Sequence, residues 1–215
     1  MSELTKRDFL AAMNRMIIIF EEEMESLCRL DSISGDGDHG ISMARGFRSV
    51  AEKLPAVQER DIGSIASMVG SSLMGDLGGV TGPIFGMIFV RLALQAQGKE
   101  QLSVTDLAQA FRAALDGIRA LGQAEVGDKT MVDALAPAVD ALERAASAGL
   151  DMRCALERAS RAAEEGASST VNMRASKGRA RYVGERSIGH QDAGATSFAL
   201  IMKALSEAYR AEGHA

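Results

Sequence analysis

Apolar residues recur along most of this chain at steps of three and four, the spacing that places them on one face of an α-helix. In the first such run the apolar positions extend from Phe9 to Leu27. A capping start precedes this run, because Asp8 follows Thr5 by three residues, the spacing at which each side chain can satisfy a free backbone amide. The pattern predicts one long amphipathic helix that ends close to a cluster of aspartates.

The same spacing predicts seven more helices. A clear run extends from Leu107 to Leu121, behind a start at Thr105 and Asp106. No alternation of apolar and polar residues is long enough to indicate a strand, and aromatic residues make up only 4% of the chain. We therefore predict an all-α fold of eight helices. The other six helical runs cover residues 41–54, 62–75, 83–97, 131–148, 150–173 and 194–212.

Glycine gathers in four segments between these helices, at residues 35–40, 75–86, 122–127 and 178–194. Alternate helix junctions of an antiparallel bundle meet at the same end. The four glycine-rich segments fall at the junctions of helices 1 and 2, 3 and 4, 5 and 6, and 7 and 8. We therefore expect them to form one composite site at one mouth of an eight-helix antiparallel barrel or bundle.

Length and composition fit a single domain over residues 1–215. With 47% hydrophobic and 25% charged residues, the chain can bury a sizeable core. Its net charge of −5 argues against a nucleic-acid partner. The apolar block at residues 16–20 is too short to span a membrane and is followed at once by three glutamates. Cys28 and Cys154 are isolated in helical runs, which favours reduced thiols and a cytoplasmic location.

The first glycine-rich segment lies among three carboxylates, those of Asp31, Asp36 and Asp38. Carboxylates that converge in a folded protein repel one another unless a cation lies between them, and hard oxygen ligands favour Mg²⁺ or Ca²⁺. We therefore predict a metal site on these three aspartates. The alternative is a turn of Asp and Gly residues that only caps the next helix.

Two familiar motifs are excluded in this segment. Gly35, Gly37 and Gly40 match the dinucleotide-binding spacing G-x-G-x-x-G, but that motif follows a strand, whereas the preceding run here is helical. An EF-hand loop starting at Asp31 needs a glutamate at its twelfth position, where Ser42 stands. Phosphate could therefore approach this segment only through a metal ion.

The second and third segments are candidates for nucleotide contacts. Thr81 and its neighbouring amides open a helix, and helix N-termini bind phosphate, although the chain has no P-loop motif. Met131 could form an apolar wall for a purine ring. The alternatives stay open at this point: the glycines before Thr81 can be structural, Met131 can belong to the core, and Asp128 can cap the following helix.

The fourth segment concentrates positive charge through Arg179, Arg181 and Arg186. Cations here could neutralise phosphate charge, and an arginine at the γ-phosphate accelerates phosphoryl transfer. A solvated charged loop is the alternative. Further along, His190 stands close to Asp192, but no serine or cysteine nucleophile accompanies them. A helix-capping Asp192 is therefore favoured over a catalytic triad.

Four strings of this sequence resemble, in order and spacing, motifs of the nucleotide-binding L subunits of dihydroxyacetone kinases. The strings are Gly-Asp-Gly-Asp-His-Gly, Gly-Gly-Val-Thr-Gly-Pro, Gly-Asp-Lys-Thr-Met and the stretch of residues 178–195. The resemblance covers nearly the whole chain. It implies an eight-helix antiparallel barrel with ADP or ATP at one mouth, held through two Mg²⁺ ions on Asp31, Asp36 and Asp38.

The resemblance also implies the remaining site residues. We expect Arg179 to act as the catalytic residue, because it would stabilise charge on the transferring γ-phosphoryl group. The sequence departs from the family at three positions, where Thr81 and Arg181 each replace a serine and Ala193 replaces a proline. The implied nucleotide contacts are His39, Gly40, Ile41, Ser42, Val80, Thr81, Gly122, Met131, Arg179, Asp192, Ala193 and Gly194.

The resemblance implies partners as well. In the family a separate K subunit or domain holds the ketose, and these 215 residues contain no such domain, so this chain alone should not phosphorylate a substrate. The phosphoryl donor is ATP in some members, whereas in others a phosphotransferase-system protein recharges bound ADP. The sequence favours neither donor, and it leaves open which ketose or aldose is used and whether the chain forms a homodimer.

Two other functions stay open beside the kinase subunit. One is a nucleotide-loaded interaction protein that docks on a regulator, since such a protein would keep the same nucleotide loops. The other is a domain like those of fatty-acid kinases. The related loop of that family usually has threonine where His39 stands, which favours the ketose-kinase family.

Overall fold

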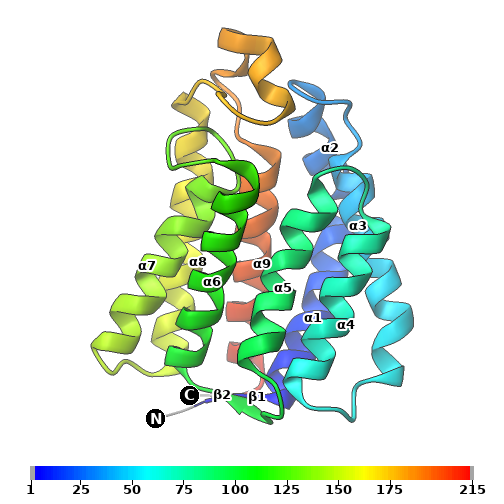
Figure 1. The fold of residues 1–215 in the computed structure, drawn as a ribbon, viewed down its shortest axis with the longest axis vertical. Coiled ribbons are helices and arrows are strands. Elements are labelled where there is room, and N and C mark those ends of the chain that lie inside the picture. The colour runs from blue at the N-terminus through cyan, green and yellow to red at the C-terminus, as the bar shows by residue number, and fades with distance from the viewer. Residues whose placement is uncertain (1–2, 214–215) are drawn as a thin grey trace.

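The structure is a computed structural model that describes residues 3–213, and its architecture is a barrel of α-helices (Figure 1). The described helices confirm the predicted all-α fold. The α-helices are α1 (Lys6–Glu22), α2 (Met24–Ser32), α3 (His39–Lys53), α4 (Ile62–Asp76), α5 (Thr81–Gln95), α6 (Val104–Gly122), α7 (Val132–Ser147), α8 (Met152–Ser169) and α9 (Ala193–Ala211). Shorter 3₁₀ segments are η1 (Leu54–Ala56), η2 (Thr170–Asn172) and η3 (Arg179–Ser187).

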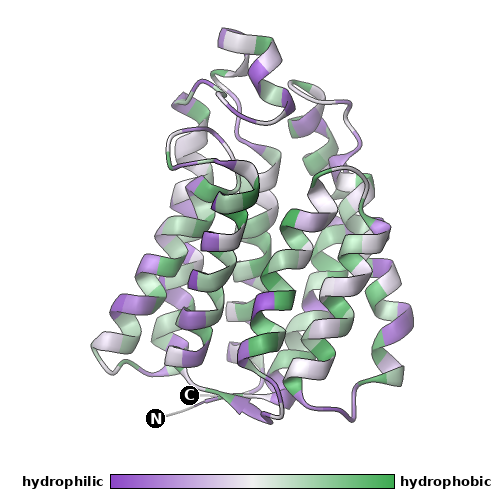
Figure 2. Cartoon of the chain, viewed as in Figure 1, coloured by the Kyte–Doolittle hydropathy of each residue, from purple (hydrophilic) through white to green (hydrophobic). Residues whose placement is uncertain are grey.

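The helices pack around the barrel in sequence order. From α3 to α9 each helix packs against the next, α3 also packs against α1, and α9 packs against α1 and so closes the ring. Apolar side chains fill the interior, and Figure 2 shows apolar residues along the helices and more hydrophilic ones in the end segments. Phe9, Phe20, Phe47, Phe111 and Phe198 are each at most 3% exposed. Burial of each such ring contributes about 2 to 3 kcal/mol to folding.

The four glycine-rich junctions do meet at one end of the barrel, which we call the mouth. It is formed by residues 33–38, 77–80, 123–131 and 170–192, all at the upper end in Figure 1. The antiparallel order of the helices therefore confirms the argument from alternate junctions. Because of the same order, α3, α5, α7 and α9 all begin at the mouth.

The first helix differs from the prediction, because it is broken at Glu23 into α1 and α2. The break is small: the Glu23 amide still donates to the Ile19 carbonyl at 2.9 Å, and the Leu27 amide donates to the Glu23 carbonyl at 2.9 Å. It lies where the start of α3 presses on α2, since a Cβ built on Gly40 would stand 1.9 Å from the Met24 carbonyl oxygen. The apolar spacing runs through the break unchanged, so the sequence pattern did not reveal it.

Other helix ends also differ from the prediction, most of them by one or two residues: α3 and α5, for example, each begin two residues earlier, at His39 and Thr81. The cap of α6 is Ser103 rather than Thr105: the Ser103 hydroxyl accepts from the Asp106 amide at 3.1 Å, and the Asp106 carboxylate accepts from the Ser103 amide at 3.0 Å. The last predicted turn of α8 is the 3₁₀ segment η2 instead. The capping box at Thr5 and Asp8 is confirmed.

A two-stranded sheet lies at the end of the barrel opposite the mouth. Its strands are β1 (Leu4–Thr5) and β2 (Gln101–Leu102), which pair antiparallel. Strands of two residues are too short to give an alternating pattern, so the sequence analysis missed them. Leu4 and Leu102 face each other in this sheet and are fully buried, which ties the start of the chain to the segment before α6.

Two further findings concern the environment of the chain. Among residues 3–213, no helix combines the length and the apolar character needed to cross a membrane. Cys28 lies in α2 and Cys154 in α8, and both thiols are free.

Candidate functional site

Three carboxylates converge where α2 ends and α3 begins. Asp31 lies in the last turn of α2, whereas Asp36 and Asp38 lie in the turn that leads into α3. Each offers an oxygen atom within 4.8 Å of those of the other two. Desolvation raises the pKa of Asp38, and the neighbouring carboxylates of Asp36 and Asp31 raise it further. Convergent carboxylate oxygens with uncompensated negative charge suit a hard divalent cation, so the residues fit the Mg²⁺ that the resemblance implies.

Asp31 also holds the turn in shape. One of its carboxylate oxygens accepts from the Gly37 amide at 2.9 Å and from the Asp38 amide at 3.1 Å. The other oxygen lies against Gly35, where a Cβ would come within 2.2 Å of it. The segment therefore has both the carboxylate oxygens of a metal site and the hydrogen bonds of an Asp and Gly turn. The two interpretations made from the sequence, a metal site and a turn that leads into the next helix, are compatible.

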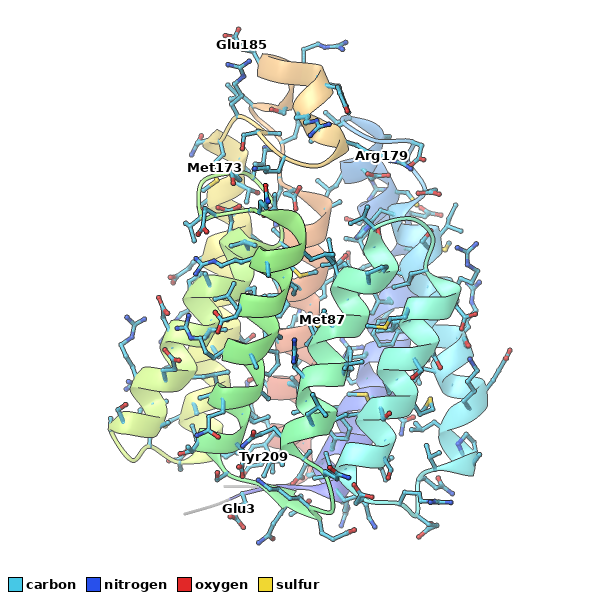
Figure 3. All side chains as sticks on the ribbon, viewed as in Figure 1. Glu3, Met87, Met173, Arg179, Glu185 and Tyr209 are labelled. Atoms are coloured by element: carbon cyan, nitrogen blue, oxygen red, sulfur yellow. The ribbon has the colours of Figure 1, made fainter. Side chains whose placement is uncertain are left out.

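Arg179 reaches this cluster from the fourth segment. Its guanidinium forms an ion pair with the carboxylate of Asp36, 143 residues away in the sequence. Figure 3 shows Arg179 on the side of the upper segment that faces α2. The hydrogen bond from Arg179 lowers the pKa of Asp36 and raises that of Arg179. The predicted catalytic arginine and the predicted metal ligands are thus in direct contact.

His39 connects three helices below the carboxylates. Its Nε2 lies 2.8 Å from the Ser197 hydroxyl of α9, and its ring centroid lies 6.0 Å from that of Phe85 in α5. Burial lowers the pKa of His39, so the neutral imidazole is favoured at pH 7. This position brings the starts of α3, α5 and α9 together around one side chain.

The structure contradicts one alternative for the third segment, in which Asp128 caps the following helix. Asp128 does not cap α7: its carboxylate accepts from the Glu125 amide at 2.8 Å and from the Ser176 hydroxyl. The amide of Thr130 is instead satisfied by Asp133 at 2.7 Å. Met131 is only 6% exposed and belongs to the apolar core.

Asp192 caps α9, as the sequence favoured. Its carboxylate accepts from the Ala195 amide at 2.8 Å, and its own amide donates to the Thr170 hydroxyl at 2.9 Å. Gly194 lies beside Met131, because a Cβ on Gly194 would stand 3.9 Å from that of Met131. The third and fourth segments therefore meet at the start of α9.

The other predicted nucleotide contacts also lie at the mouth. Gly40 and Ser42 are buried in the first turn of α3, whereas Ile41 between them is half exposed. Val80 and Thr81 stand at the start of α5, and Val80 is 65% exposed. Gly122 ends α6 and faces open space. Ala193 follows Asp192 as the first residue of α9.

The sequence analysis gave no role to Lys129. In the structure this residue lies where the third segment contacts the fourth. The side chain is 4% exposed, and its ammonium donates to the backbone carbonyls of Thr170 and His190. Lysine is almost never fully buried, so composition and periodicity gave no signal for this position.

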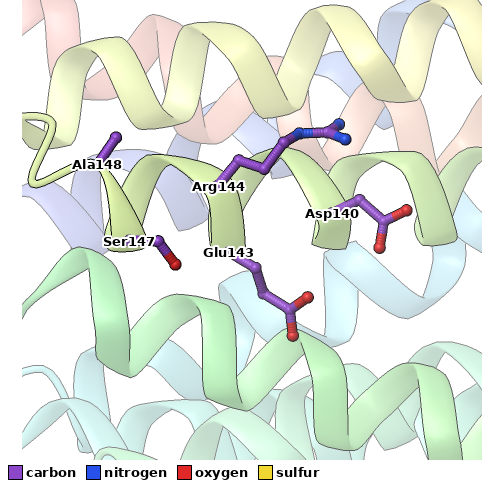
Figure 4. Close-up of a pocket in the computed structure, with 5 residues that line it drawn as sticks. All are labelled: Asp140, Glu143, Arg144, Ser147 and Ala148. Atoms are coloured by element: carbon purple, nitrogen blue, oxygen red, sulfur yellow. The ribbon is translucent and has the colours of Figure 1, made fainter.

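A hollow of about 500 Å³ lies elsewhere, on the outer surface of the lower half of α7 (Figure 4). Arg112 of α6 pairs there with Asp140 at 3.0 Å and Glu143 at 2.6 Å. The hollow shares no residue with the mouth. Its lining residues are Asp140, Glu143, Arg144, Ser147 and Ala148.

The charge of Asp192 should make stability depend on pH. Desolvation raises the pKa of Asp192 from 3.8 to about 6, so the folded state holds this proton more tightly than the unfolded state. Stability contributed by the protonated form is present at low pH and is lost as the pH rises through about 6. Asp192→Asn keeps a good helix cap without the charge and should therefore be more stable than wild type at pH 8, by up to about 2 to 3 kcal/mol.

Urea unfolding of both proteins without nucleotide, at pH 5, 6.5 and 8, measures this difference. The free energies of unfolding of wild type and variant should approach each other at pH 5 and separate at pH 8. A constant difference between them at all three values would contradict the assignment.

Comparison with known proteins identifies the family. The DAK2 domain family model matches residues 33–207. The chain is 45% identical over 188 residues to the ADP-binding subunit DhaL of the PEP-dependent dihydroxyacetone kinase of Escherichia coli (strain K12). That match covers 87% of this chain and 90% of the relative.

Solved structures agree with the sequence comparison. The native dihydroxyacetone kinase of C. freundii matches with a TM-score of 0.71 and 26% identity over 93% of this chain and 34% of that one. Its complex with AMP-PNP and Mg²⁺ matches with a TM-score of 0.69 and 26% identity, over 92% of this chain and 33% of that one. This chain thus spans about a third of that enzyme's length. The resemblance to the L subunits of dihydroxyacetone kinases is confirmed, and the chain belongs to the DAK2 domain family.

Proposed function

We propose that this chain is the ADP- or ATP-binding subunit of a dihydroxyacetone-type kinase and passes the γ-phosphoryl group to a small ketose on a separate K-type subunit. The observation that carries the proposal is the meeting of three carboxylates and Arg179 at one mouth. The similarity to an ADP-binding kinase subunit from E. coli supports it. A cytoplasmic location fits this role.

Asp31, Asp36 and Asp38 would hold two Mg²⁺ ions beside the nucleotide phosphates. Mg²⁺ would supply positive charge there that offsets the charges of the carboxylates and of the nucleotide phosphates. The part played by this chain is to fix the three oxygens in place. Asp31 fixes the turn by accepting hydrogen bonds from its backbone amides. Gly40 lets α3 approach α2 closely, which brings the carboxylates of the two elements together.

The mouth is also suited to an anion through its helix ends. The helices α3, α5, α7 and α9 all begin there, and each helix N-terminus carries a partial positive charge of about half an elementary charge. We assign phosphate contacts to the first turn of α3 and to Val80 and Thr81, and further nucleotide contacts to Asp192, Ala193 and Gly194. Gly122 and Met131 would contact the base.

Arg179 would move from Asp36 toward the nucleotide and would stabilise charge on the transferring phosphoryl group there. Its side chain is 68% exposed, so the movement breaks few contacts. Arg181, which stands where the family usually has serine, stacks over the ring of Tyr182, with its guanidinium carbon 4.7 Å from the ring centroid.

Native mass spectrometry of the purified chain, with and without EDTA, tests the proposal. We expect bound ADP or ATP with two Mg²⁺, and loss of both after EDTA treatment. Bound ADP that resists exchange with ATP would indicate recharging by a phosphotransferase-system protein, whereas free exchange would indicate ATP as the donor. A chain that binds no nucleotide at any Mg²⁺ concentration would refute the function.

A further inference from the structure

Lys129 has an unusual backbone and an unusual environment. Its φ of +60° lies in the left-handed region, which is unfavourable for a residue other than glycine. The residue is nevertheless followed by a regular helix, and its side chain is 4% exposed. Such a conformation persists only where the surrounding contacts compensate for its cost. The contacts made by the ammonium group therefore need an explanation.

The ammonium group joins the two ends of one long segment. It donates to the Thr170 carbonyl at 2.6 Å and to the His190 carbonyl. Between these two residues lies the segment 171–189, which contains η3 and Arg179. Hydrogen bonds from an ionised donor are about twice as strong as neutral ones, and burial strengthens them further. Lys129 therefore ties the base of this segment to the start of α7.

Other contacts hold the same base closed. The Gly189 amide donates to the Val171 carbonyl at 2.7 Å, and the Asp192 amide donates to the Thr170 hydroxyl at 2.9 Å. Burial lowers the pKa of Lys129, whereas the charges of Asp192 and Asp133 act in the opposite direction. The ammonium thus lies between two backbone carbonyls and two carboxylates, at the place where α7, α8 and α9 meet.

By contrast, the tip of the segment is held by exposed contacts. Arg179 and Asp36 form an ion pair whose side chains are 68% and 51% exposed, and exposed ion pairs contribute little to stability. Figure 1 shows the segment projecting above the barrel beside the end of α2. Ser176 also donates to Asp128 through its amide and its hydroxyl, so the position of the tip depends on the buried base and on these contacts with the third segment.

We propose that Lys129 is a positioning residue: its buried ammonium fixes the base of the segment 171–189 and so places Arg179 and Asp192 for nucleotide binding. This inference rests on the proposed function, because it gives Lys129 a role at the same mouth. Without the ammonium, the Thr170 carbonyl keeps only the Met173 amide as a donor, the His190 carbonyl loses the contact that ties it to Thr170, and the base of the segment opens toward water.

Lys129→Met tests the inference, because methionine keeps a long side chain and removes the charge. We expect the Kd for ADP in the presence of Mg²⁺, measured by calorimetry, to rise about 10- to 100-fold. Hydrogen exchange should become faster at the amides of Gly189 and Asp192, with protection of α1 and α4 unchanged. Lys203→Met is the matched control, because Lys203 lies on α9 with its side chain 44% exposed, and it should leave affinity and exchange as in wild type.

A rescue experiment separates positioning from general loss of stability. In Lys129→Ala, ethylammonium should restore part of the affinity and part of the protection at Gly189, whereas tetramethylammonium at equal ionic strength should not. If both variants fail to fold, Lys129→Gln, which keeps a neutral donor, should fold and show an intermediate Kd.

The outcomes distinguish this inference from the proposed function. Wild-type affinity in Lys129→Met, or exchange that accelerates equally in all helices, would overturn the positioning role and leave the proposed function intact. If wild type itself binds no ADP, the proposed function fails, and the exchange of Gly189 and Asp192 still decides whether Lys129 fixes the segment.

Discussion

Asp36→Asn should weaken Mg²⁺-dependent nucleotide binding at least about 100-fold. Loss of a residue that merely orients a metal ligand costs about 10- to 100-fold in metal affinity, so loss of a ligand charge should cost at least as much. The oxygen of Asp36 lies within 4.8 Å of those of Asp31 and Asp38, and a neutral amide there attracts a divalent cation far less. Calorimetric titration with ADP at several Mg²⁺ concentrations measures the effect.

The stability of the same variant provides the internal control. Without metal, Asp36 is repelled by Asp38 and attracted by Arg179, and both contacts are exposed, so Asp36→Asn should change the melting temperature of the metal-free chain little. Asp140→Asn removes an equally charged surface carboxylate from α7, 53% exposed and away from the mouth, and should bind ADP as wild type does. Undiminished binding in Asp36→Asn would remove Asp36 from the metal site.

Gly40→Ala should destabilise the fold by about 3 kcal/mol and disrupt the mouth. The added Cβ would stand 1.9 Å from the Met24 carbonyl oxygen and 3.0 Å from the Cys28 amide nitrogen, and backbone atoms cannot rotate away as side chains can. Overpacking of this kind typically costs about 1 to 3 kcal/mol, and here α3 must move away from α2. Since Asp31 lies on α2 and Asp38 at the start of α3, the carboxylates should separate and Mg²⁺ affinity should fall.

Urea unfolding of Gly40→Ala and titration with Mn²⁺, followed by electron paramagnetic resonance, measure the two effects. Gly75→Ala is the matched control, because Gly75 lies in α4 and a Cβ there meets nothing within 4 Å. That substitution should be neutral or stabilise by up to about 1 kcal/mol, since alanine favours helices over glycine. Equal free energies of unfolding in Gly40→Ala and wild type would contradict the close approach of α2 and α3.

Periodicity alone predicted most of the helices, because a buried helix face must be apolar at every third or fourth position whatever its neighbours are. It failed where a tertiary contact acted on a continuous pattern. The break at Glu23 lies where Gly40 approaches Met24, and these residues are too far apart in sequence for a local pattern to relate them. Strands of two residues, as at Leu4 and Thr5, carry no periodicity at all.

The sequence by itself determined the all-α fold and the common end of its four glycine-rich junctions, because antiparallel order follows from counting helices. It also identified the three carboxylates of the mouth as candidate metal ligands, since like charges that crowd into one short turn indicate a bound cation. Only the tertiary structure brought Arg179 to Asp36 and buried Lys129 between the carbonyls of Thr170 and His190. These contacts join residues that are distant in sequence, and their geometry depends on how the finished helices pack.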